Sequence, residues 1–247
     1  MRPLSLLLLA LLFSVQTHAE APRTFREAKK IAWHIYAERP VDFYCRCQFQ
    51  GSRIDLAGCG YVPRKQPKRA ARVEWEHIVP AWVIGHQRQC WQQGGRKQCT
   101  ARDPVFSQAE ADLHNLVPVV GEVNGDRSNY GFGMLSEKPS QYGACPFVVN
   151  FKQRTAMPPA YSRGAIARVY LYMSERYRLR LSKQDRRLYE AWNRQYPVDE
   201  WEQWRNRNVA CVQGNANRHV GPVDLRRCAS VLSRLGRARL APRVGAG

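Results

Sequence analysis

Hydrophobic positions recur at helical spacing in several stretches of the chain. The first begins with a T-x-x-E capping box at Thr24 and runs from Phe25 to Tyr36, and Pro40 is expected to stop it. Three more follow the Pro158-Pro159 pair, at residues 163–177, 182–196 and 198–209. Their aromatic residues fall at core spacing, so we expect them to pack inside the protein rather than stack on a ligand.

Shorter patterns between these helices predict strands and loops. Residues 73–79, closed by Pro80, and residues 113–120 are expected to be strands. Segment 41–60 is typical of a hairpin with loops. The basic segment 63–72 is expected to be an exposed loop or arm. Residues 87–103 are polar and hold two cysteines, which favours a long loop. With no repeat or linker, we predict one α+β domain at 20–235, mostly helical, and a loose tail at 236–247.

The first 19 residues are typical of a secretory signal. Arg2 gives a positive start, an apolar run extends from Leu4 to Val15, and cleavage is expected after Ala19. The apolar run is shorter than the ~20 residues that span a bilayer, and no later segment is apolar enough, so we expect no membrane anchor. The protein is therefore expected in the periplasm or outside the cell.

Net charge narrows the class of partner. The chain has 39 Lys and Arg against 20 Asp and Glu, a net charge of +19, and 44% hydrophobic residues, which excludes a disordered chain. Removal of the signal would leave +18. Such a surface attracts polyanions: nucleic acid, anionic lipid or acidic polysaccharide. We further expect a phosphate-binding face on the C-terminal helices, where seven arginines gather: Arg163, Arg168, Arg176, Arg178, Arg180, Arg186 and Arg187.

All eight cysteines lie behind the signal, which predicts disulfides in an oxidising compartment. A zinc site is the alternative, but no C-x-x-C pair is present to support it. Sequence alone leaves many connectivities open. Pairing nearest neighbours suggests Cys47–Cys59, Cys90–Cys99 and Cys211–Cys228, which leaves Cys45–Cys145 as the fourth link.

Three short segments carry candidate chemistry: residues 74–80 (EWEHIVP), 112–118 (DLHNLVP) and 122–127 (EVNGDR). Phosphodiester hydrolysis needs a base near neutral pH, which His77 can supply. It also needs a hard cation such as Mg²⁺ to neutralise charge, and such a cation prefers oxygen ligands. Glu76 and Asn124 offer those oxygens. If the first strand ends at the Glu76–His77 pair, both side chains can face one cleft, and a short helix would bring Asn124 to it.

The sequence resembles the endonuclease I family of bacterial periplasmic and secreted nucleases. The shared blocks are WEHIVPAW from Trp75, GHQRQCWQ from Gly85, GGRK from Gly94, HNL-P from His114, GEVNGDR from Gly121 and RGAIAR from Arg163. They cover most of the chain beyond the signal. Cys211 departs from the family's usual cysteine positions.

This resemblance implies a ββα-metal active site, also called a His-Me finger, related to the HNH endonucleases. His77 would be the general base, Glu76 and Asn124 the metal ligands, and Arg96 a contact to the scissile phosphate. Asn115 would steady the loop that holds the catalytic histidine, and Arg127 would support the site. The implied activity is non-specific, Mg²⁺-dependent cleavage of DNA to 5′-phosphate ends, with Ca²⁺ or Mn²⁺ as other cations and RNA as a second substrate.

Two other classes of function fit the charge. One is a non-catalytic basic nucleic-acid-binding protein of the envelope, and the other a cationic protein that binds envelope or polysaccharide. Neither needs Glu76, His77 and Asn124 together. We expect the protein to act as a monomer.

Overall fold

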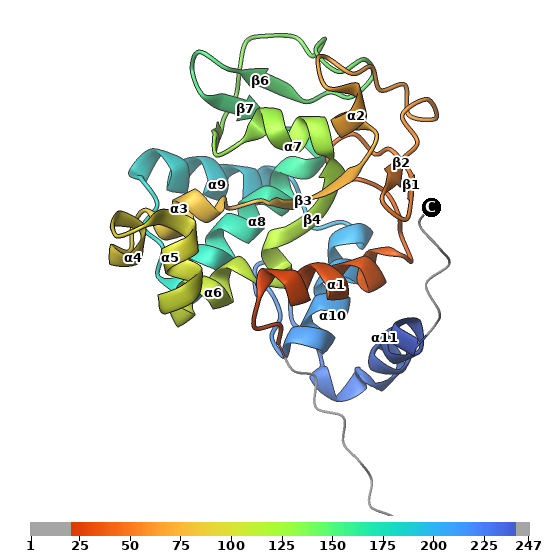
Figure 1. Ribbon diagram of the computed structural model, residues 1–247, viewed down its shortest axis with the longest axis vertical. Helices are drawn as coiled ribbons and strands as arrows, with labels where there is room; N and C mark the ends of the chain where they lie inside the picture. Colours follow the sequence, from red (N-terminus) through yellow and green to blue (C-terminus); the bar gives the residue numbers. More distant parts are fainter. Residues whose placement is uncertain (1–20, 241–247) are drawn as a thin grey trace, which may run out of the picture.

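The computed structural model describes residues 21–240 and is an α+β domain with small sheets and many helices (Figure 1). The expected signal at 1–19 and residues 241–247 lie outside the described residues. The helices are α1 Phe25–Tyr36, α2 Pro67–Ala70, α3 Ala81–Gly85, α4 Gln89–Gln92, α5 Gly95–Arg102, α6 Pro104–Glu110, α7 Gly121–Arg127, α8 Ala160–Tyr177, α9 Lys183–Gln195, α10 Glu200–Gln213 and α11 Ala229–Leu240, with 3-10 turns η1 Leu113–Asn115 and η2 Leu225–Arg227.

Helix α1 confirms the first predicted element. The side chain of Thr24 accepts a hydrogen bond from the backbone of Glu27, as a capping box requires. The Glu27 carboxylate reaches back to the backbone N–H of Arg23, one residue before the cap. The inner face of α1 is buried, and the hydroxyl of Tyr36 donates to the carbonyl of Leu116. Helix α1 is thereby fixed against the central hairpin.

That hairpin joins β3 (Val73–His77) and β4 (Leu116–Val120) as antiparallel neighbours. Glu76 pairs with Val117, and His77 pairs with Leu116 at the end of the ladder. Both predicted strands exist but are shorter than expected, since β3 ends at His77 and η1 precedes β4. Helix α7 follows β4 without a connecting loop, which gives the strand–strand–helix order expected for the active site.

Two predicted loops contain helices instead. Residues 87–103 form α4 and α5, and the basic segment 63–72 contains α2. Apolar periodicity is missing from α4 and α5 because their inward residues are mainly Cys90 and Cys99, which are joined to each other. Gly94 and Gly95 have positive φ angles and turn the chain between the two helices.

A small three-stranded sheet was not predicted. Its strands are β5 (Gly131–Phe132), β7 (Thr155–Met157) and β6 (Val148–Asn150), with β7 in the middle. The side-chain amide of Gln141 bonds to both the N–H and the C=O of Val149 on the edge strand β6. Strands this short carry too few residues for an alternating pattern to stand out. A further two-stranded ladder is β1 Phe49–Gln50 with β2 Arg53–Ile54.

The C-terminal helices were predicted in type and approximate position. Helix α8 is buried along most of its length and packs against α9, where Tyr170 and Tyr189 stack with ring centroids 4.1 Å apart. Helix α11 runs to Leu240 and so includes the first residues of the expected tail 236–247, the rest of which lies outside the described residues. Within residues 21–240, no helix is long and apolar enough to cross a membrane.

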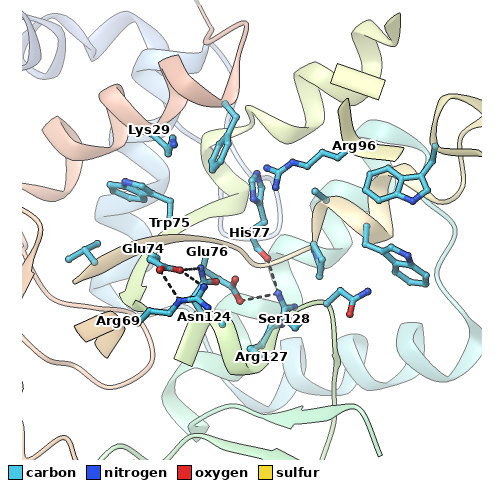
Figure 2. Close-up of a pocket in the computed structure, with 18 residues that line it drawn as sticks. Lys29, Arg69, Glu74, Trp75, Glu76, His77, Arg96, Asn124, Arg127 and Ser128 are labelled. Atoms are coloured by element: carbon cyan, nitrogen blue, oxygen red, sulfur yellow. Dashed lines mark hydrogen bonds and ion pairs between the residues drawn. The ribbon is translucent and has the colours of Figure 1, made fainter. Parts of the chain in front are cut away.

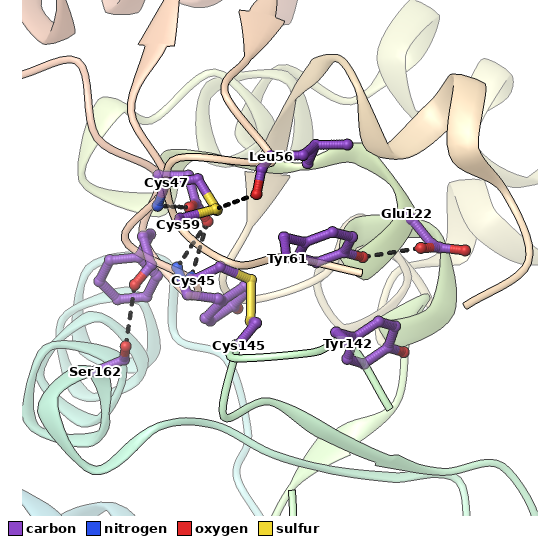
Figure 3. Close-up of a disulfide and its surroundings, with 12 residues drawn as sticks. Cys45, Cys47, Leu56, Cys59, Tyr61, Glu122, Tyr142, Cys145 and Ser162 are labelled. Atoms are coloured by element: carbon purple, nitrogen blue, oxygen red, sulfur yellow. Dashed lines mark hydrogen bonds between the residues drawn. A yellow bond between two sulfur atoms is a disulfide. The ribbon is translucent and has the colours of Figure 1, made fainter. Parts of the chain in front are cut away.

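The structure forms four disulfides, which are the pairs suggested from the sequence. Figure 3 shows Cys45–Cys145 and Cys47–Cys59. Cys45–Cys145 joins residues 100 positions apart, and Cys47–Cys59 lies next to it. Cys90–Cys99 ties α4 to α5, and Cys211–Cys228 ties α10 to the segment before α11. The link with the longest loop thus closes the part of the chain that contains β3, β4 and α7.

We expect the double replacement Cys45→Ala/Cys145→Ala to destabilise the protein more than Cys90→Ala/Cys99→Ala. Both pairs are buried, so the packing losses are similar, but the chain-entropy treatment gives about 4.7 kcal/mol for a 100-residue loop against about 3 kcal/mol for a short one. Urea unfolding of the two oxidised variants measures the difference. Equal costs, or the reverse order, would contradict it.

Candidate active site

A cavity of about 670 Å³ opens beside the end of β3 (Figure 2). It brings together most of the site residues expected from sequence, which come from β3, α5 and α7. Glu76 and His77 lie on β3, so the end of the strand does let two adjacent residues face one cleft. The predicted residues that line it are Glu76, His77, Arg96, Asn124 and Arg127.

His77 is buried and has a fixed orientation. Its Nε2 lies 2.7 Å from the carbonyl oxygen of Glu110, and its ring packs 4.5 Å from the ring of Phe25. Because a carbonyl only accepts, Nε2 carries the hydrogen and Nδ1 carries the lone pair. Burial lowers the pKa of His77 to about 4, and the positive charges of Arg96 and Arg127 lower it too. The imidazole is therefore neutral at pH 7 and able to accept a proton at Nδ1.

The Glu76 carboxylate is 3% exposed and held on one oxygen. Its Oε1 accepts a hydrogen bond from the hydroxyl of Tyr44 (3.0 Å) and lies 2.9 Å from Nη1 of Arg127. Burial raises the pKa of Glu76 to about 7, against the opposing effects of Arg127 and Tyr44. A nearby cation would favour the charged form of this group.

Asn124 reaches the cavity from α7, and its amide is anchored. Nδ2 donates to Oε2 of Glu74 at 2.8 Å (Figure 2). Burial alone would raise the pKa of Glu74, but hydrogen bonds from Arg69, Asn124 and Arg72 hold it below its usual value. Sequence reasoning gave Glu74 no role. The available signal was its spacing, because residues two apart on a strand face the same side, and Glu74 therefore shares a face with Glu76.

Arg127 is fully buried behind the strand that carries the site. Its guanidinium donates to the carbonyls of His77 (2.9 Å) and Ile78 (2.7 Å), contacts Glu76 and lies over the ring of Phe132. Burial opposes its charge, yet Glu76 and neighbouring tyrosines raise the pKa of Arg127 above the usual value. This side chain joins the end of α7 to the Glu76–His77 end of β3.

Arg96 extends from α5 and is half exposed. Its Nε donates to Oε1 of Glu110 at 2.5 Å. Glu110 thus fixes two site residues, His77 through its backbone and Arg96 through its carboxylate. Sequence reasoning missed Glu110, which lies 33 positions from His77 at the end of α6 and belongs to no motif. The Cys90–Cys99 link holds α5, as expected for the segment that bears Arg96.

Asn115 does not line the cavity. Its side chain donates to the carbonyl of Val79 (2.9 Å) and accepts from the N–H of Val79 (2.7 Å). This two-point contact holds the chain two residues after His77. The family resemblance predicted that Asn115 steadies this loop.

The donor set suits a hard divalent cation. Glu76 offers carboxylate oxygen and Asn124 offers amide oxygen, both at the cavity. Among residues 21–240 no group of three or more His, Cys, Asp or Glu gathers in a way that could hold a metal. Two oxygen donors are nevertheless sufficient for Mg²⁺, because this ion keeps several of its waters and is often bound through one or two side chains plus substrate phosphate.

Positively charged side chains line the cavity, but they are not the arginines of the C-terminal helices that were expected to bind phosphate. Lys29, Arg69 and Arg96 line the cavity. On the C-terminal helices, Arg168 instead forms a buried ion pair with Glu202, and Arg163 donates to Pro158 and Tyr196. A guanidinium has five donors and suits internal contacts with carbonyl groups, so an arginine count overstates the surface available to phosphate.

The exposed ring of Trp82 is a further feature that sequence reasoning did not select. It is 44% exposed, lines the cavity and stacks on His86 with ring centroids 4.0 Å apart. The stacking partner covers one side of the indole. Lys29 also lines the cavity and lies over the ring of Phe25. The cavity wall therefore combines cations with an exposed aromatic edge.

Comparison with known proteins matches this chain over nearly its whole length. The sequence model of the Endonuclease I family covers residues 14–223. An extracellular deoxyribonuclease of Aeromonas hydrophila is 54% identical over 221 residues, which cover 87% of this chain and 96% of that protein. A periplasmic deoxyribonuclease of the same species is 52% identical over 220 residues (87% and 92%), and endonuclease-1 of Buchnera aphidicola is 45% identical over 200 residues (79% and 80%). The chain belongs to the endonuclease I family.

Proposed function

We propose that the protein is a periplasmic or secreted endonuclease that hydrolyses phosphodiester bonds of DNA at the cavity beside β3. The observation that carries this proposal is the orientation of His77, whose Nε2–H is bound to Glu110 so that Nδ1 is basic, in the same cavity as Glu76 and Asn124. Relatives named extracellular and periplasmic deoxyribonuclease support DNA as the substrate and the compartment outside the cytoplasm.

In this mechanism His77 Nδ1 takes a proton from the water that attacks the scissile phosphorus, and the bond from phosphorus to the 3′ oxygen breaks. The 3′ oxygen takes a proton from solvent, and the imidazolium of His77 gives its proton back to solvent. Arg96 binds a non-bridging oxygen of the scissile phosphate, and Glu110 fixes its direction. Glu76 and Asn124 would hold Mg²⁺, or Ca²⁺ or Mn²⁺ in its place. When bound, such a cation neutralises the charge that develops on the phosphate and on the leaving 3′ oxygen. The products carry 5′-phosphate and 3′-hydroxyl ends.

Binding relies on charge and therefore has little sequence preference. Contacts to the phosphate backbone contribute affinity without reading bases. Lys29 and Arg96 at the cavity are placed for such contacts. RNA has the same phosphates, so we propose it as a secondary substrate, and we propose that the active protein is a monomer.

Nicking of supercoiled plasmid by the purified, oxidised protein tests the proposal. The wild type should nick with Mg²⁺ and stop with EDTA, while His77→Ala should lose about 10²–10⁴-fold or more in rate yet keep binding DNA, because only the base is removed. His219→Ala, which removes an imidazole bound to Glu175 away from the cavity, is the control and should nick like the wild type. Activity that survives EDTA, or near-normal nicking by His77→Ala, would reject the mechanism.

Loss of a ligand should change the dependence on cation. In Glu76→Ala and Asn124→Ala we expect the Mg²⁺ concentration at half-maximal rate to rise by more than about tenfold, the lower end of what even an outer contact of a metal site costs. Higher Mg²⁺ should restore part of their rate but none of the rate of His77→Ala. Mg²⁺ titrations of nicking make the measurement. An unchanged midpoint in both variants would remove these residues from the metal site.

Salt dependence should report the phosphate contacts. On the inactive His77→Ala protein, log affinity for duplex DNA should fall linearly with log salt, with a slope of roughly −0.9 per phosphate bound. Adding Lys29→Ala should make the slope shallower by about 0.9 if Lys29 binds one phosphate. Lys152→Ala, in a different groove beside β6, is the charge-matched control. A flat response to salt would show that the positive charge serves another partner.

A further inference from the structure

Helix α7 is held by the basic segment 63–72 as well as by the hairpin. The buried carboxylate of Glu122 accepts hydrogen bonds from the backbone N–H groups of Arg64, Lys65 and Gln66. The guanidinium of Arg64 binds Asp126 of the same helix through two bonds. The segment expected to be a free basic arm is therefore fixed along one side of the helix that carries Asn124.

Two glycines on α7 make this contact close. Gly121 and Gly125 are four residues apart and so lie on the same face of the helix. A Cβ on Gly121 would come within 2.5 Å of the carbonyl oxygen of Arg69, and one on Gly125 within 2.1 Å of Arg69 Nη1. A larger residue at Gly121 would push against the backbone of Arg69, and one at Gly125 would occupy the space in which the Arg69 guanidinium lies.

Arg69 uses this position to hold Glu74. Its Nε and Nη2 bind the two oxygens of the Glu74 carboxylate at 2.9 and 2.8 Å, and Arg72 adds contacts to Oε1. The remaining strong contact of the carboxylate is with Nδ2 of Asn124 at 2.8 Å. A carboxylate bound by two guanidinium groups only accepts hydrogen bonds, so it requires the nitrogen side of the amide to face it. The oxygen Oδ1 must then face the other way.

We propose that Glu74 is a positioning residue for the cation site: held by Arg69, it binds the amide nitrogen of Asn124 and turns Oδ1 towards the cation. The inference rests on the proposed function, since it assigns Asn124 to the metal. It also explains why an amide and not a second carboxylate stands at position 124, because two carboxylates would face each other there. Gly125 contributes to this arrangement because its lack of a side chain leaves room for the Arg69 guanidinium.

Binding of Mn²⁺, followed through the electron paramagnetic resonance signal of the free ion and competed with Mg²⁺, tests this without measuring cleavage. In the full oxidised protein, Glu74→Ala should weaken Mn²⁺ binding by about 10- to 100-fold, as loss of a partner behind a metal ligand does. Glu200→Ala removes a carboxylate that is paired with Arg39 on the exposed side of α10, so it changes the net charge equally and should bind as the wild type does.

Gly125→Ala separates positioning from folding. Its new methyl group displaces only the flexible end of Arg69 and improves the helix propensity of α7, so the melting temperature should hold or rise while Mn²⁺ binding weakens. The double variant Arg69→Ala/Gly125→Ala should bind Mn²⁺ with the same affinity as Arg69→Ala alone. An additional loss there would mean that the methyl group blocks the cation directly and would overturn the role given to Gly125.

The outcomes distinguish this inference from the function on which it rests. If Asn124→Ala loses Mn²⁺ binding while Glu74→Ala and Gly125→Ala bind it as the wild type does, the positioning role of Glu74 is wrong and the metal site stands. If Asn124→Ala binds Mn²⁺ like the wild type, the assignment of Asn124 to the metal is wrong, and with it the proposed function as stated.

Discussion

A buried positive charge, the guanidinium of Arg127, is the constraint on which the site depends. A charge removed from water must be paired and hydrogen-bonded, and here the partners are the Glu76 carboxylate and the carbonyls of His77 and Ile78. These contacts run from the last residue of α7 to the end of β3. They fix the helix that carries Asn124 relative to the strand that carries Glu76 and His77. The three groups proposed for the chemistry therefore keep one arrangement.

The elements that bear the site are short, and covalent links and side-chain contacts compensate for their length. Strand β3 has five residues, α7 has seven, and α5, which carries Arg96, has eight. Cys45–Cys145 closes the long segment that contains them, and Cys90–Cys99 holds α5 to α4. Asp42 accepts hydrogen bonds from the backbone N–H groups of Tyr44, Cys45 and Cys47 and so fixes the loop from which Tyr44 reaches Glu76. Such a fold suits an oxidising compartment, where these links persist.

The excess of arginine serves the interior as well as the surface. Arg205 donates to the carbonyls of Leu113, His114 and Leu116 and to the hydroxyl of Tyr36, and thereby fixes η1 and the start of β4. Arg168 on α8 forms an ion pair with Glu202 on α10 and so joins these two helices. Because a planar fork of donors can satisfy several carbonyls at once, arginine is well suited to joining irregular segments. The cations that surround the cavity are therefore a small, specific part of the total charge.

The sequence by itself determined the family, the α+β class, the long helices and the order strand–strand–helix, because these depend on local patterns and on motifs that stand close together in the chain. It also predicted the groups that we propose for the chemistry, since Glu76, His77 and Asn124 belong to those motifs, and the spacing of the cysteines suggested the four pairs that form. Only the tertiary structure decided how the groups are oriented. Glu110 orients His77, which is 33 positions away, and Arg96, which is 14 positions away. Glu74 orients Asn124, which is 50 positions away. Hydrogen bonds between such distant residues produce no periodic pattern in the sequence. Helices as short as α2, α4 and α5 have no apolar pattern of their own, because a disulfide or neighbouring side chains hold them in place.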